Sequence, residues 1–288
     1  MGVLGTLPTA HALRWRAQVP VVRGLMRLDL LATVSTMAPY VAAAVVAAIT
    51  GFVLQNDLYR VEQDGLLVLS EPFGLPVYMG TLVLSVFQAA SVAIAVARER
   101  EQGAVELLFY GPVDARTYLV AKLCTHVLLY LWLTALVVVC YLLFAVVTGL
   151  RLSSTVGWAL LLSVGTAAAA ISMALAVAAV VRRLRAAVLM VLGLLVLAIG
   201  LQVLTEVLAR LPTPEFHVSP VQALRVAAFL LSTVAGWVLP FSYLDRGLSA
   251  LVRGDTLAYL GTIAACGIYV VIMLGAAWIG LDRTGVRG

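Results

Sequence analysis

Charged residues are scarce in this sequence. Only 33 of its 288 residues are Asp, Glu, Lys or Arg, which is 11%, whereas 63% are apolar. Soluble enzymes carry about a quarter charged residues, and disordered chains combine high charge with low hydrophobicity. The composition therefore excludes both classes and predicts that lipid surrounds most of the chain.

Cysteine is also scarce, and the sequence lacks the common motifs of catalysis. Cys124, Cys140 and Cys266 all lie in apolar runs, without the spacing of a CxxC or Cys/His metal site. HExxH, GxSxG and the phosphate-binding GxxxxGK[ST] pattern are absent. We therefore expect no disulfide scaffold, no metal site and no catalytic residues.

Long uncharged runs are the main positive feature. A helix needs roughly 20 apolar residues to cross a hydrocarbon core of about 30 Å. The runs predict an all-α polytopic membrane protein, with residues 1–288 forming a single transmembrane domain of six spans. The expected spans cover approximately 34–54, 77–97, 119–148, 155–181, 186–206 and 256–281.

Two shorter helices are expected in an outer segment, 209–255, before the last span. Pro240 should end an apolar helix over 226–239, which has re-entrant or interfacial length. Residues 241–253 place apolar side chains at helical spacing, which predicts an amphipathic helix along the membrane surface. Asp255 can then cap the last span.

The distribution of basic residues predicts the orientation. With six spans and both termini cytoplasmic, 13 Lys and Arg residues lie inside and six outside, as the positive-inside rule requires. Residues 1–33 predict an interfacial N-terminal helix, interrupted near Pro20, and a loosely ordered basic tail is the alternative. Because the basic residues are spread between apolar runs, we expect membrane lipids and no nucleic acid as partners.

The cytoplasmic loop over 98–118 is the most charged part of the chain. After Gly103, the segment 106–109 can form one or two helical turns, which Gly111 and Pro112 should stop. A solvated loop is the alternative interpretation. Apolar residues interspersed among the charges favour a short helix that offers an apolar face to a partner.

This loop also carries a resemblance to a known family. Residues 99–108 (EREQGAVELL), with 111–113 (GPV) and Lys122, resemble the ERExGTxExLLxxPV…GK pattern of type-2 ABC transporter permeases. Residues 239–255 resemble the later SPF…RG…RD pattern of the gliding-motility and nitrous-oxide-reductase-maturation permeases, the branch that the chain resembles most. The chain departs from these patterns at Ala104, Ala121 and Leu239.

The resemblance implies a function and a set of partners. The chain would be the permease subunit of an ATP-driven exporter in a prokaryotic plasma membrane, paired with a second permease copy or homologue. Two copies of a cytoplasmic ABC ATPase subunit would bind ATP and Mg²⁺, so this chain would bind no cofactor. The residues implied in coupling to the ATPase are Glu99, Glu101, Gly103, Glu106, Leu107, Leu108 and Pro112.

Few polar residues within the spans could touch a substrate. Gln88, Gln202 and Glu206 are the candidates for a substrate path, and helix packing or a snorkelling carboxylate is the alternative. Because unpaired polar groups are costly in hydrocarbon, this scarcity predicts a hydrophobic or amphiphilic substrate. A secondary transporter and a non-transporting assembly or anchor subunit remain as alternative functions.

Overall fold

The computed structural model describes residues 10–64, 72–110, 113–181, 183–210, 226–227, 230–231, 233 and 236–285. Over these residues the chain is all-helical and contains no strand. The helices are α1 (Ala10–Val34), α2 (Ala38–Asp64), α3 (Gly74–Glu101), α4 (Ala104–Tyr110), α5 (Ala115–Thr148), α6 (Ser154–Val180), α7 (Leu184–Arg210), α9 (Phe241–Arg253) and α10 (Thr256–Gly285).

Five of the described helices are long and apolar enough to cross a membrane. These segments are Ala38–Tyr59, Gly74–Glu101, Ala115–Thr148, Ser154–Val180 and Thr256–Arg283. The fifth expected span, 186–206, falls on α7, whose described apolar stretch is Leu184–Leu194. The membrane location of α7, and with it the six-span count, stays a prediction.

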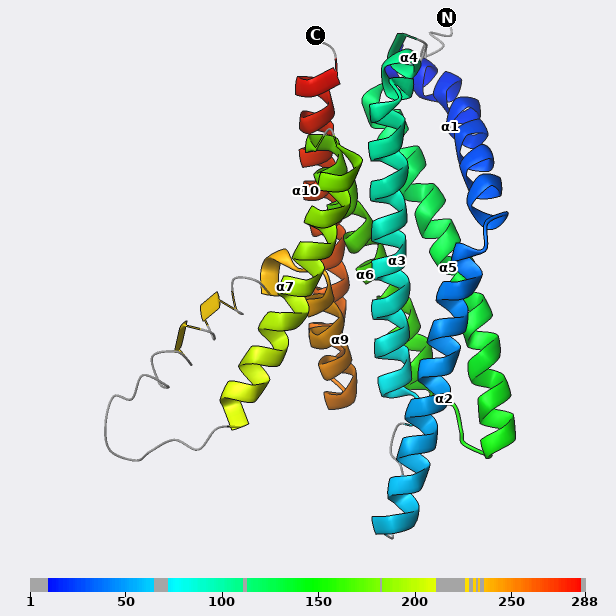
Figure 1. Ribbon diagram of the computed structural model, residues 1–288, viewed down its shortest axis with the longest axis vertical. Helices are drawn as coiled ribbons and strands as arrows, with labels where there is room; N and C mark the ends of the chain where they lie inside the picture. Colours follow the sequence, from blue (N-terminus) through cyan, green and yellow to red (C-terminus); the bar gives the residue numbers. More distant parts are fainter. Residues whose placement is uncertain are drawn as a thin grey trace, which may run out of the picture.

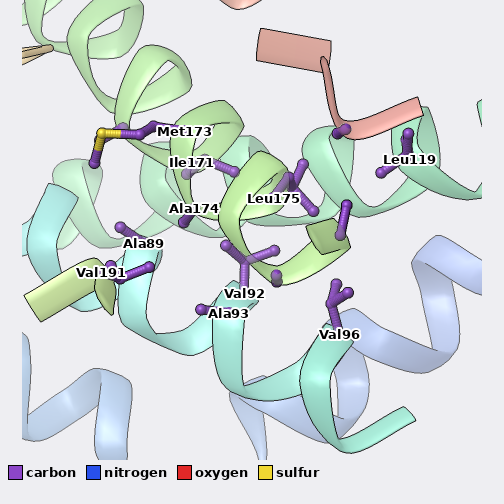
Figure 2. Packing of buried hydrophobic residues seen from close by; sticks show 14 of the residues in the cluster. Ala89, Val92, Ala93, Val96, Leu119, Ile171, Met173, Ala174, Leu175 and Val191 are labelled. Carbon is purple, nitrogen blue, oxygen red and sulfur yellow. The ribbon is translucent and has the colours of Figure 1, made fainter. Parts of the chain in front are cut away.

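Helix α6 lies at the centre of the bundle, packed against α3 and α10 (Figure 1). Its sequence explains the close packing, because small side chains let neighbouring backbones approach one another. Ala170 and Ala174 are fully buried, and α3 contributes Ala89 and Val92 to the same cluster. Figure 2 shows Ala89, Val92 and Ala174 gathered between the two helices.

Helix α1 differs from the expected interrupted segment. The helix runs through Pro20 without a break, so the predicted interruption is wrong. Contacts with other helices offset the helix-breaking effect of Pro20. Helix α1 packs along α5, and Val21 and Leu25 pack against the main core cluster. A role for this helix at the lipid interface stays a prediction.

Helix α9 covers its apolar face with protein. Phe241, Leu244 and Gly247 are buried where α9 packs against α6 and α10. The helix therefore needs no lipid surface to cover this face, although the sequence predicts a surface helix. Asp255 accepts a hydrogen bond from the backbone N–H of Ala258 over 3.0 Å, which confirms the predicted cap of α10.

One end of the bundle brings together the segments predicted to be cytoplasmic. The α4 helix, the beginning of α1 and the end of α10 all lie at this end (Figure 1). The beginning of α5 follows α4 closely in the chain and is at the same end. We call it the α4 end.

Candidate functional site

The site begins where α3 turns into α4. The backbone N–H groups of Gln102 and Gly103 donate to the carbonyls of Arg98 and Arg100 over 3.0 and 3.1 Å. Gly103 adopts a φ of 69°, a left-handed conformation that glycine tolerates better than other residues. This glycine closes α3 and lets α4 start at the next residue.

Helix α4 has one face on the bundle and one face outward. Val105 is buried, and Phe109 packs edge-on against the Tyr118 ring at a centroid distance of 6.2 Å. On the outward face, Leu107 is 72% exposed and Tyr110 is 91% exposed. An aliphatic and an aromatic side chain thus project from the α4 end without protein around them.

Glu99, in the last turn of α3, binds α5 directly and reaches α1 through a lysine of α5. The Tyr118 hydroxyl donates to Glu99 Oε2 over 2.6 Å, and Lys122 Nζ donates to Glu99 Oε1 over 2.5 Å. Lys122 also pairs with Asp29 of α1 over 2.7 Å. Because only 5% of Lys122 is exposed, its charge depends on these two carboxylates in place of water.

The next two residues connect to the loop between α6 and α7. Arg100 donates to the carbonyls of Ala178 and Ala179 in the last turn of α6, where helix carbonyls lack partners inside the helix. Glu101 accepts from the backbone N–H of Leu184, the first residue of α7, over 2.6 Å. A carboxylate at a helix N-terminus and a guanidinium at a C-terminus both complement the helix dipole.

Three consecutive residues, 99–101, therefore link the end of α3 to α1, α5, α6 and α7. The predicted coupling residues do not all contribute in the same way. Glu99 and Glu101 form these links, whereas Leu107 is exposed and Leu108 is half-buried against the core. The side chain of Glu106 and the whole of Pro112 lie outside the described residues.

The structure describes the side chain of one of the three candidates for a substrate path. Gln88 is fully buried, and its Oε1 atom lies 3.0 Å from His126 Nδ1. Gln202 and Glu206 lie on α7, with side chains outside the described residues. Contact between any of the three and a substrate stays a prediction.

Helix α5 has a buried polar face that was not predicted from the sequence. Tyr118, Lys122, His126 and Tyr130 are buried and lie four residues apart, so they share one side of the helix. This face meets Glu99 and Gln88 of α3. The four-residue spacing was a usable signal, because polar side chains at this interval in an apolar helix indicate a face that packs on protein.

The comparison with protein families supplies the decisive observation. The model of the family described as "ABC-2 family transporter protein" matches residues 69–279, which include α3 to α9 and most of α10. The chain belongs to the ABC-2 transporter family. It is therefore the permease part of an ABC transporter and a multi-pass membrane protein, and its family implies an ABC ATPase as partner. A comparison with curated proteins found no match.

Family membership gives the α4 end its context. The family implies a partner ABC ATPase in general, and the sequence lacks the GxxxxGK[ST] pattern that binds nucleotide phosphates. The match does not distinguish between branches of the family, so the resemblance to the gliding-motility and nitrous-oxide-reductase-maturation branch stays a prediction.

Proposed function

We propose that this ABC-2 permease is one membrane half of an exporter, and that α4 is the coupling helix on which a cytoplasmic ATPase subunit docks. The observation that carries the proposal is the outward face of α4. Leu107 and Tyr110 are both largely exposed at the end of the bundle that also carries charged residues of α3. Interface cores are enriched in aromatic and apolar side chains surrounded by a polar rim, and this face has that composition.

The links made by residues 99–101 give the docked helix a way to move the bundle. Rigid-body rotation of an ATPase would displace α4, and the short turn at Gly103 would pass that displacement to the end of α3. From there Glu99 binds Lys122 of α5, which in turn binds Asp29 of α1. Arg100 binds α6, and Glu101 binds α7. A rigid cluster of packed helices transmits such a displacement better than a flexible loop does.

The proposed assembly has two membrane halves. A second permease copy or homologue completes the translocation path, and each half receives one ATPase subunit that binds ATP and Mg²⁺. Six spans in a prokaryotic plasma membrane, with both termini and α4 in the cytoplasm, agree with the shared location of α4, the beginning of α1 and the end of α10 (Figure 1).

The proposed cargo is an amphiphile or another hydrophobic molecule. The described spans bury few charged groups, and Lys122, the exception on α5, is paired with two carboxylates near the α4 end. A path for ions or sugars would need polar groups that face a cavity, since unpaired polar groups in hydrocarbon are costly. The described polar residue of the candidate path, Gln88, is instead bonded to His126.

The test is co-purification from native membranes. We expect the tagged full-length chain to retain an ATPase subunit, identified by mass. A Leu107→Ala, Tyr110→Ala variant should lose most of that subunit, because truncation removes both exposed anchors of the interface. Leu257→Ala is the matched control, since Leu257 is 82% exposed at the beginning of α10, away from the α4 end.

Each outcome separates the alternatives. Retention of the ATPase by the double variant, with the same yield as the control, would contradict the assignment of α4. Transport by the purified chain without ATP would indicate a secondary transporter. A complex that stays intact but transports no cargo would indicate an anchor or assembly subunit. In that case the rate of ATP hydrolysis by the complex should not change when the permease chain carries substitutions.

A further inference from the structure

A second feature of the α4 end is a groove between α5 and α10. It has a volume of about 250 Å³ and is lined by Arg116, Leu119, Val120, Leu274, Gly275 and Trp278. Arg116 is the only charged residue in this lining. The groove takes no part in the links of residues 99–101, so the proposed coupling function does not account for it.

The polar and apolar parts of the groove are ordered along the bundle. Arg116 lies in the first turn of α5, and Leu119 follows about one turn deeper. Trp278 lies near the end of α10, and Gly275 is again about one turn deeper because α10 runs the opposite way (Figure 1). The charge is thus at the mouth of the groove and the apolar lining lies below it.

The guanidinium of Arg116 is positioned to bind an anion. Its Cζ atom lies 3.8 Å from the centroid of the Trp278 ring, so the indole supports one face of the guanidinium. The N–H donors point outward from the edge of this planar group, where stacking leaves them available. No described residue accepts a hydrogen bond from Arg116, and its side chain is exposed.

We infer that this groove binds an anionic glycerophospholipid. The phosphate would accept hydrogen bonds from Arg116, and one acyl chain would lie over Leu119, Leu274 and Gly275. Three observations favour this occupant: the complementary charge, the apolar lining below it, and a tryptophan at the mouth, where aromatic rings meet lipid headgroups. The groove lies at the beginning of α5, the helix that follows α4, so the bound lipid would stabilise the position of that helix.

Gly275 provides a sharp test of this site. Gly275 lines the groove, and a Cβ atom built on it has no neighbour within 4 Å, so a side chain can start there without meeting protein. Gly267 has the same open surroundings on the same helix but does not line the groove. Gly275→Leu therefore blocks the site, and Gly267→Leu is its matched control.

The measurement is native mass spectrometry of the delipidated full-length chain, titrated with dioleoylphosphatidylglycerol or dioleoylphosphatidylcholine. We expect one tightly bound phosphatidylglycerol. Arg116→Gln should weaken it by about tenfold, as expected for the loss of a charge-assisted hydrogen bond. Gly275→Leu should weaken binding at least as much, and Gly267→Leu should match the unchanged chain. Arg116→Lys keeps the positive charge but loses the stacked guanidinium, so it should weaken binding less than Arg116→Gln does.

Two results would overturn the inference. One is phosphatidylglycerol binding that is unaffected by both Arg116→Gln and Gly275→Leu. The other is efficient cross-linking between Gly275→Cys positions of two copies, which would show that a second copy covers the groove. Melting temperatures of the variants identify any general loss of folding, and Arg116→Gln, a change at an exposed side chain, keeps the test valid if Gly275→Leu fails to fold. The assay contains no ATPase, so its result is independent of the coupling proposal.

Discussion

Glu101 and Leu184 are 83 residues apart in the sequence, yet the carboxylate of Glu101 accepts a hydrogen bond from the backbone N–H of Leu184 over 2.6 Å. The bond joins the end of α3 to the start of α7, two helices joined to different loops at the α4 end. Because Leu184 is the first residue of α7, its N–H has no partner within that helix, and Glu101 takes the place of a local cap.

Removing this carboxylate should loosen the first turn of α7. We expect Glu101→Ala to speed amide hydrogen exchange over residues 184–187 by roughly fivefold, as expected for a lost cap worth about 1 kcal/mol. Glu101→Gln keeps a carbonyl acceptor and should exchange nearly as slowly as the unchanged chain. Equal exchange in all three proteins would show that the bond does not hold α7.

Replacing the buried Lys122 should be strongly destabilising. Lys122→Met leaves the carboxylates of Asp29 and Glu99 close together without a cation, so we expect a loss of about 3 kcal/mol in the free energy of unfolding. This is the low end for broken buried pairs, because the carboxylates are 30% and 26% exposed and water screens part of the effect. Denaturation in mixed micelles measures the change.

Neutralising the partners provides the control for that variant. A Lys122→Met, Asp29→Asn, Glu99→Gln triple variant removes the repulsion together with the cation, so it should recover more than half of the lost stability. A triple variant less stable than Lys122→Met alone would mean that the charges of this cluster do not explain the loss.

The turn between α3 and α4 should be sensitive to any side chain at Gly103. Its φ of 69° is strained for alanine, so Gly103→Ala should lower the free energy of unfolding by about 1 kcal/mol. Gly24→Ala should instead raise the free energy of unfolding by about 0.5 kcal/mol. Gly24 is inside α1, where alanine favours the helix, and an added Cβ has nothing within 4 Å. The same sign in both variants would contradict this account of the turn.

Gly247 should be needed for α9 to approach α6. A Cβ on Gly247 would overlap the side chain of Leu162, which is fully buried and has little room to move. We therefore expect Gly247→Ala to lower the free energy of unfolding by about 2 kcal/mol, because the added methyl group overpacks this contact. In a Leu162→Ala background the same change should cost less than about 0.5 kcal/mol. Equal costs in the two backgrounds, measured by unfolding in mixed micelles, would refute the contact.

Much of the helical framework could be predicted from the sequence, because length and hydropathy determine which runs form long helices in lipid. The position of α4 also followed from local signals, since Gly103 and the glycine-proline pair at 111–112 mark its two ends. The path of α1 did not follow, because its contacts with α5 override the effect of Pro20. Nor did the burial of α9, because periodicity reveals an apolar face but not whether lipid or protein covers it.

The site was predictable as a segment but not as a set of contacts. The motif identified residues 99–108, and nothing in it indicated that Glu99 reaches Lys122 or that Glu101 reaches Leu184. Such pairs depend on how helices distant in sequence pack together. The motif also gave Leu107 and Leu108 the same role, whereas the structure exposes Leu107 and Tyr110 and turns Leu108 toward the core.

Site-specific photo-cross-linking tests the central claim most directly. A photoreactive phenylalanine analogue at Tyr110, the most exposed large side chain of α4, should capture the ATPase subunit in native membranes, while the same probe at Leu257 should not. A cross-link from Tyr110 to the ATPase is the result that this account predicts. Labelling of Tyr110 by a membrane-impermeant reagent added outside intact cells, with no ATPase captured, would contradict it.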